Sequence, residues 1–237
     1  MAAFIPRAGA TLVSAAADGT PGNSGTNTGS NSIAAVSADG RFVVFNSWAW
    51  NLVAGDSQYI DGQTATQADT FYKDLQTGRI EFVLLAEGGR PTSRNDLSTF
   101  VGEDFSMSAD GRYVSFTTTS NILLYRSFLG NAPGTSNPNI TAGDNNANAD
   151  VYVRDMATGK VWLASSDAAG LSGTSGASGY VSRESSLSTD GSQVAFVSGN
   201  DKLIAGDTNA RDDIFIKTLA TGAIRRVSTD SAGNQVS

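Results

Sequence analysis

A turn motif that occurs three times constrains the fold of this chain more than any other feature of its sequence. A Ser-x-Asp-Gly tetrapeptide precedes an alternating apolar run at residues 37–45, 108–116 and 188–196. Asp-Gly between two short strand-like runs is a hairpin signal, because Gly tolerates positive φ and the Asp side chain bonds to the nearby backbone. The sequence therefore predicts three similar β-hairpins.

A second pair of strands follows each hairpin. It begins with a run that starts at Asp and leads through a Thr-Gly turn into a last strand, at residues 69–84, 150–164 and 213–228. With the short run ahead of each Ser-x-Asp-Gly, every unit holds four antiparallel strands. Tandem units of this kind are typical of β-propeller blades, which bury their faces only against one another.

The combined pattern resembles the TolB-type (WD40-like) β-propeller repeat family. The resemblance rests on the Ser-x-Asp-Gly strand, the Asp-led strand and the Thr-Gly turn, and it covers residues 30–230. It implies an all-β fold of four-stranded antiparallel blades. Because propellers of this type occur beside peptidase domains, it also implies an alternative role as the non-catalytic propeller domain of a hydrolase or lyase.

The blade count predicts an open or incomplete propeller. Three complete blades and one extra N-terminal strand, at residues 11–14, do not close a ring, since propellers have about four to eight blades. The chain is therefore either a segment of a longer propeller or a subunit that associates through exposed blade edges. The expected divisions are an N-terminal strand and Gly/Ser/Thr/Asn-rich loop (1–30), blade 1 (31–86), blade 2 (103–166), blade 3 (184–229) and a C-terminal tail (230–237).

Composition excludes several classes of function. The sequence has no Cys and no His, so it forms no disulfide, thiolate nucleophile or Ser-His-Asp triad. A formal net charge of -7 argues against nucleic-acid binding, and no apolar run is long enough for a membrane span. Acidic, Cys-free sequences are common among bacterial extracellular proteins. We therefore expect an extracellular or cell-surface protein of bacterial type, whose signal is not present in this chain.

Two loops predict Ca²⁺ sites. Asp and Asn recur between the second and third strands of two blades, which resembles the first half of an EF-hand loop and suits an ion that takes about six to eight oxygen ligands. The candidate ligands are Asp144, Asn146, Asn148 and Asp150 in blade 2, and Asp207, Asn209 and Asp213 in blade 3. Both loops lack the Gly and Glu that complete an EF-hand. The alternative is a solvated loop whose side chains cap its own turns.

Aromatic side chains in blade 1 form a candidate ligand site. Trp48 and Trp50 flank Ala49 at the end of a predicted strand, so both rings should point to one side, and Tyr59 lies in the following loop. Such rings can stack on sugars, whereas packing between blades is the alternative.

The repeated carboxylates are assigned to turns rather than to catalysis. Asp39, Asp110 and Asp190 recur in every blade, and an active site is normally built once. We therefore expect no enzyme activity, although a pair of non-repeated acids such as Glu103 and Glu184 around a cleft would favour an enzyme acting on carbohydrate. The leading hypothesis is a β-propeller module that binds protein or polysaccharide, is stabilised by Ca²⁺ and self-assembles.

Overall fold

The chain folds into three four-stranded antiparallel sheets and one two-stranded ribbon. The computed structural model describes residues 11–23, 32–54, 59–60, 63–64, 69–83, 104–118, 148–172, 181–209 and 211–235. These residues contain no helix, and so none that is long and apolar enough to cross a membrane. The predicted fold class, an all-β chain of four-stranded antiparallel sheets, is confirmed.

Each four-stranded sheet is one blade, with its strands hydrogen-bonded in chain order. Blade 1 contains β1 (Ser32–Val36), β2 (Phe42–Ser47), β5 (Asp69–Asp74) and β6 (Ile80–Phe82); blade 2 contains β7 (Ser106–Met107), β8 (Tyr113–Thr118), β9 (Asp150–Asp155) and β10 (Val161–Leu163); blade 3 contains β11 (Ser182–Leu187), β12 (Gln193–Ser198), β13 (Asp213–Thr218) and β14 (Ile224–Arg226). The ribbon pairs β3 (Tyr59–Ile60) with β4 (Gln63–Thr64). A register shift between Arg183 and Ser186 lets β11 begin at Ser182, ahead of the predicted start at 184.

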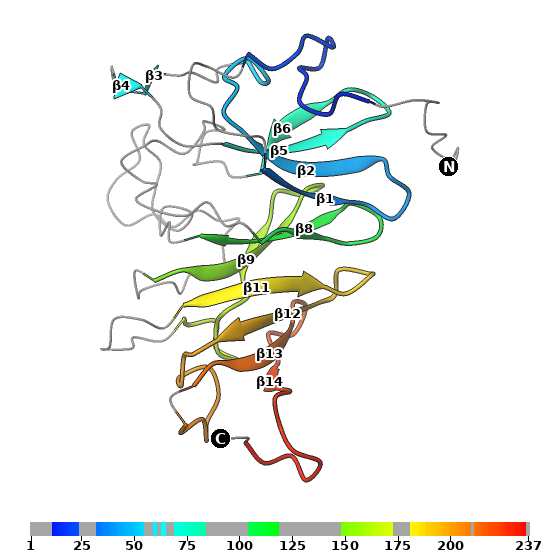
Figure 1. The fold of residues 1–237 in the computed structure, drawn as a ribbon. Coiled ribbons are helices and arrows are strands. Elements are labelled where there is room, and N and C mark those ends of the chain that lie inside the picture. The colour runs from blue at the N-terminus through cyan, green and yellow to red at the C-terminus, as the bar shows by residue number, and fades with distance from the viewer. Residues whose placement is uncertain are drawn as a thin grey trace.

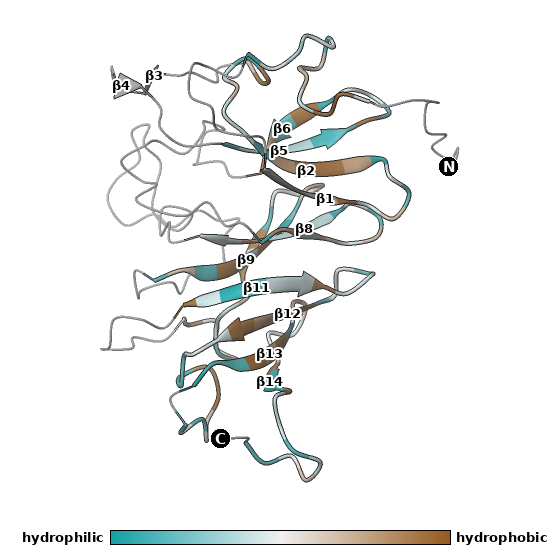
Figure 2. Ribbon diagram, viewed as in Figure 1, coloured by the Kyte–Doolittle hydropathy of each residue, from teal (hydrophilic) through white to brown (hydrophobic). Residues whose placement is uncertain are grey.

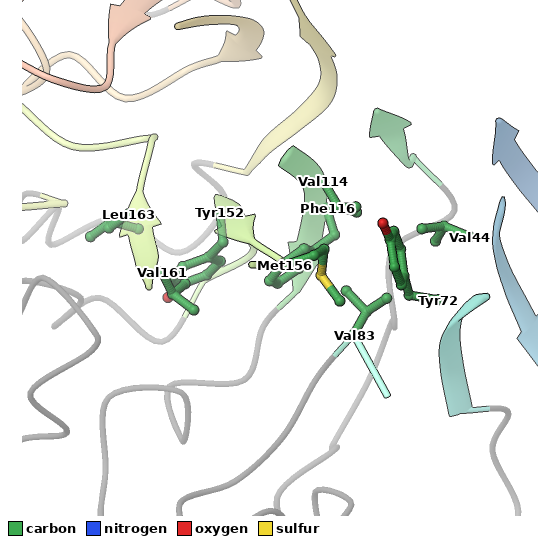
Figure 3. Close-up of a cluster of buried hydrophobic side chains, with 9 residues drawn as sticks. All are labelled: Val44, Tyr72, Val83, Val114, Phe116, Tyr152, Met156, Val161 and Leu163. Atoms are coloured by element: carbon green, nitrogen blue, oxygen red, sulfur yellow. The ribbon is translucent and has the colours of Figure 1, made fainter. Parts of the chain in front are cut away.

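The three blades stack face to face in chain order, and the N-terminal and C-terminal segments lie at opposite ends of the stack (Figure 1). Apolar residues are concentrated in the middle strands, as β2 and β12 show (Figure 2). One buried cluster joins blade 1 to blade 2 and contains Val44, Tyr72, Val83, Val114, Phe116, Tyr152, Met156, Val161 and Leu163 (Figure 3). A second cluster joins Val151, Val153 and Ala164 of blade 2 to Val194, Phe196 and Phe215 of blade 3. Each blade is thus held by its neighbour's apolar face.

The Ser-x-Asp-Gly turns have the same hydrogen bonds in every blade. In blade 1, Ser37 Oγ donates to Asp39 Oδ1 at 2.6 Å, and the Arg41 amide donates to the same oxygen at 3.0 Å. Asp110 and Asp190 accept the corresponding bonds in the other two blades. These carboxylates therefore serve the turns, as the recurrence predicted.

In blades 1 and 2, an aromatic ring lies against the Gly of the next blade's turn. A Cβ built on Gly111 would lie 2.3 Å from Phe42 Cδ2, and one on Gly191 would lie 2.2 Å from Tyr113 Cδ2. By contrast, a Cβ on Gly40 of blade 1 would meet nothing within 4 Å. Gly is therefore required in the second and third turns both for positive φ and for room between blades.

Two of the blades carry an ion pair between the second and third strands. Arg41 Nε and Nη2 donate to Asp74 Oδ1 and Oδ2 at 2.9 and 2.6 Å, and Arg112 binds Asp155 in the same way. The hydrogen bond from Arg41 lowers the pKa of Asp74 to about 2. Two-point binding of this kind fixes the guanidinium over the neighbouring aromatic ring, with Arg41 Cζ 4.6 Å from the Phe42 ring centre.

Candidate functional site

Within the described part of the chain, blade 3 packs only one of its two faces against another blade. Its strand β13 alternates between buried and exposed or half-buried residues, whereas β5 and β9 are buried along almost their whole length. The uncovered side of β12, β13 and the segment that follows contains Ala195, Val197, Ile214, Ile216, Arg225 and Val227, which we call the blade-3 outer face. Ile214 is 45% exposed, while Val151, at the same register in blade 2, is 0% exposed. An uncovered apolar sheet face is typical of an interaction surface.

Three short hairpins in the chain share one geometry. They are the N-terminal hairpin (residues 13–22), the middle hairpin (164–172) and the C-terminal hairpin (227–235). Their first turns are closed by amide-to-carbonyl bonds from Ala15 to Val13, from Ser166 to Ala164 and from Thr229 to Val227, at 2.8, 2.8 and 2.9 Å. Their turning glycines Gly19, Gly170 and Gly233 have φ of 88°, 86° and 83°. The middle and C-terminal hairpins each follow the fourth strand of a blade.

Blades 1 and 3 bind a hairpin through a buried Lys on the third strand. Lys73 Nζ donates to the carbonyl oxygens of Val13, at 3.0 Å, and of Ala15. Lys217 Nζ donates to the carbonyl oxygen of Ser166 at 2.8 Å. Burial lowers the pKa of both lysines, that of Lys217 to about 8, so the Lys217 ammonium group is mainly charged at neutral pH. Each charge is stabilised by carbonyl dipoles at the end of the preceding unit.

An Asn side chain in the loop after the second strand binds the far end of the same hairpins. Asn51 Nδ2 donates to the carbonyl oxygen of Pro21 at 3.0 Å, and Asn200 Nδ2 donates to that of Ser172. In blade 2, Arg154 takes the position of the two lysines and donates to carbonyls at the end of β6. The contact between successive units is therefore repeated along the chain. The role of its basic residues was not predicted from the sequence.

The two terminal hairpins differ in what they contact. The N-terminal hairpin lies against blade 1, in the place that the end of a preceding blade would occupy, with Val13 packed on the cluster around Phe45 and Phe71. Residues 11–14, which were predicted to be a fourth strand, occupy this place without forming a strand. Among the described residues, the C-terminal hairpin is bound by no following blade. Gln235 instead bonds back to its own blade.

The predicted ligands in blade 3 surround a guanidinium group. Arg226 Nη1 lies 3.5 Å from Asp207 Oδ1 and 3.6 Å from Asp213 Oδ2, and both acid side chains are 2% exposed. Gln235 Nε2 donates to the same two oxygens at 2.7 and 3.1 Å. The third predicted ligand, Asn209, accepts a hydrogen bond at its Oδ1 from the Arg211 amide at 3.0 Å. The structure thus brings two of the three predicted acceptors together, around a positive charge supplied by the chain itself.

The predicted ligands in blade 2 are described only in part. Asp144 and Asn146 lie outside the described residues. Asp150 is buried at the start of β9 and its Oδ1 accepts from Ser165 Oγ at 2.6 Å. The described residues contain no group of three or more acidic side chains arranged to hold a metal ion.

Of the aromatic candidates, Trp50 lies beside the end of the N-terminal hairpin. β2 ends at Ser47, so Trp48 and Trp50 belong to the turn that follows it, and the period of a strand does not set the direction of their rings. Both side chains are half-buried, and the Trp50 amide donates to Asn23 Oδ1 at 3.2 Å. Tyr59 is part of the β3–β4 ribbon, but its side chain is outside the description.

Of the acids that bear on the enzyme alternative, Glu184 lies at the junction of blades 2 and 3. Glu103 is outside the described residues, but Asp104 is described, and its Oδ2 accepts from the Glu184 amide at 3.2 Å. Glu184 is exposed and has a φ of 55°, which the register shift in β11 produces. Asp104 and Glu184 are thus linked through the backbone amide of Glu184.

Solved structures with similar folds are propellers. TolB from Acinetobacter baumannii is 17% identical over 85% of this chain and 33% of its own, with a TM-score of 0.42. The propeller domain of the Trilobed protease from Pyrococcus furiosus, which has an open velcro topology, is 12% identical over 82% of this chain and 40% of its own, with a TM-score of 0.40. Dipeptidyl peptidase 4 from Porphyromonas gingivalis is 11% identical over 85% of this chain and 26% of its own, with a TM-score of 0.43.

This chain spans less than half the length of each of these proteins. No family model matches the sequence, and no curated protein does. The assignment of the fold rests on the repeated sheets, turns and contacts between sheets. Together they identify the chain as three four-stranded blades of an open or incomplete β-propeller.

Proposed function

We propose that the chain is a non-enzymatic β-propeller module, extracellular or at the cell surface, that binds another protein through the blade-3 outer face. The observation that supports this proposal is the apolar face at the end of the stack, where Ile214 is 45% exposed and Val151 of blade 2 is 0% exposed. A polysaccharide is the alternative ligand, on which Trp48 and Trp50, with Tyr59, would stack.

Photo-cross-linking from the outer face tests this proposal. A photoreactive residue in place of Ile214 should form adducts with one protein in intact producing cells, whereas the same residue in place of Leu171, which is 48% exposed on the middle hairpin, should not. The purified partner should then bind Ile214→Asp at least about tenfold more weakly than the wild type, because a buried unpaired charge is costly. Equal binding by the two proteins would refute the proposal.

We also propose that Ca²⁺ binds the blade-2 loop through Asp144, Asn146, Asn148 and Asp150, on the strength of the alternating oxygen ligands. In blade 3, Arg226 already supplies one positive charge beside Asp207 and Asp213. Saturating Ca²⁺ should raise the Tm by about 5–10 °C above the Tm in EDTA. A free Ca²⁺ concentration of about 100 times the Kd adds about 2.7 kcal/mol to the free energy of unfolding. Asp144→Ala should remove the rise, and a Tm that EDTA leaves unchanged in the wild type would rule the metal out.

The non-catalytic propeller domain of a hydrolase or lyase remains the second candidate. It uses the same blades and the same outer face, and differs in what that face contacts. A partner that proves to be a catalytic domain would favour this candidate over a surface module.

A further inference from the structure

The contacts between successive blades extend to their turns. The Ala38 amide donates to the Ala109 carbonyl at 2.9 Å, and the Ala109 amide donates to the Thr189 carbonyl at 2.8 Å. Among the described residues, neither the Thr189 amide nor the Ala38 carbonyl has a partner in an adjoining blade. Blade 3 therefore ends with an unused donor, and blade 1 begins with an unused acceptor, of the same repeated bond.

The binding site for the N-terminal hairpin also has the groups that the C-terminal hairpin requires. Since the two hairpins share their hydrogen bonds and the φ of their turning glycines, the carbonyls of Val227 and Thr229 correspond to those of Val13 and Ala15. Lys73 could therefore bind either pair. Bridges between Ala15 and Pro21 and between Thr229 and Gln235 complete the correspondence.

We infer that blade 1 binds the C-terminal hairpin and the blade-3 outer face of a second copy once its own N-terminal hairpin is displaced, so that copies join head to tail. The N-terminal hairpin is then a removable cap. This inference rests on the proposed function, because it uses the same outer face. Exchanging equivalent elements between copies costs little free energy, because each contact within a copy is replaced by a similar contact between copies. A head-to-tail contact also leaves a free binding face on every added copy.

Two differences between the hairpins favour the capped state. A Cβ on Gly22 would lie 2.9 Å from the Ala49 Cβ, and the corresponding residue after the C-terminal hairpin in the sequence is Val236. Arg225 occupies the same position in the fourth strand of blade 3 as Glu81 does in blade 1. The negative charge of Glu81 stabilises the positive charge of Arg154 in the next blade. In a head-to-tail contact Arg225 would face Lys73, and like charges repel.

The test removes the cap by substitution in the full chain. The double variant Gly22→Val, Val236→Gly places side-chain atoms against Ala49 in the chain's own hairpin and removes them from the incoming one. Sedimentation velocity of this double variant should therefore show masses that rise with concentration through multiples of the monomer, while the wild type stays monomeric. Val236→Gly alone is the control, because it leaves the chain's own hairpin unchanged, and it should stay monomeric. Val13→Asp, which weakens only the contact of the chain's own hairpin with the cluster around Phe45 and Phe71, should also uncap the chain if the double variant does not fold.

Further variants identify the surface. Adding Ile214→Asp to the double variant should restore the monomer, and adding Arg225→Glu should tighten association about tenfold or more. An added peptide of residues 11–23 should dissociate the assemblies. A double variant and a Val13→Asp protein that are both folded and monomeric, or assemblies that Ile214→Asp does not affect, would overturn the inference. If the inference is overturned in this way but a different protein still needs Ile214 for binding, only the exchange of hairpins is wrong and the proposed function stands.

Discussion

Gly111→Ala should lower the free energy of unfolding by about 2–5 kcal/mol, of which about 1–2 kcal/mol is the cost of positive φ and about 1–3 kcal/mol is overpacking. Gly111 has a φ of 76°, and its new Cβ would lie 2.3 Å from Phe42 Cδ2 and 2.8 Å from Phe42 Cβ. Because the nearest atoms include Phe42 Cβ, rotation of the ring does not relieve the contact.

Gly40→Ala is the matched control for this prediction. Gly40 occupies the same turn with a φ of 75°, but a Cβ there meets nothing within 4 Å, so only the conformational cost of about 1–2 kcal/mol applies. Urea unfolding of both variants gives the difference, which isolates packing between blades. Adding Phe42→Ala should reduce the extra cost of Gly111→Ala. Equal losses at the two glycines would show that Phe42 does not lie over the second turn.

Arg226→Leu should cost about 3–5 kcal/mol, because it leaves two buried carboxylates without their cation. Leu is the residue at the same register of blade 2, where Leu163 is 3% exposed, so the shape of the replacement suits a blade. The loss therefore reports on the charge of Asp207 and Asp213, whose side chains are each 2% exposed.

Divalent cations should partly replace Arg226 in this variant. Millimolar Ca²⁺ should raise the Tm of Arg226→Leu more than that of the wild type, because the two carboxylates then lack a positive partner. Arg226→Lys is the control, since it keeps the charge, and it should lose less stability and gain no extra response to Ca²⁺. A loss below about 1 kcal/mol for Arg226→Leu would mean that the guanidinium does not neutralise these acids.

The blades were predictable because their determinants are local. Ser37, Asp39 and Gly40 specify a turn within a few residues, and the alternation of apolar residues beside that turn specifies a strand. Repetition then gave the stacking, since a four-stranded sheet with two apolar faces needs neighbours. The same reasoning identified residues 11–14 as equivalent to the end of a blade.

The contacts of the candidate sites were not predictable in the same way. Arg226 approaches Asp207 from a different strand, so spacing within the loop could not reveal that a cation of the chain lies there. Trp48 and Trp50 were assigned to the end of a strand, but β2 ends at Ser47. Lys73 could have been recognised from one pattern, the basic residue at the same position in every third strand. Its acceptors could not be predicted, because they are distant in the sequence.

The most direct test of face-to-face stacking is a nuclear Overhauser spectrum of the full chain. The account predicts contacts from the Phe42 ring to the Gly111 α-protons and from the Tyr113 ring to the Gly191 α-protons, with both glycines shifted upfield by the rings. The Gly40 α-protons should show no such contact or shift. Rings that instead contact one another within a single sandwich, with Gly111 and Gly191 no different from Gly40, would contradict the arrangement of the chain as successive propeller blades.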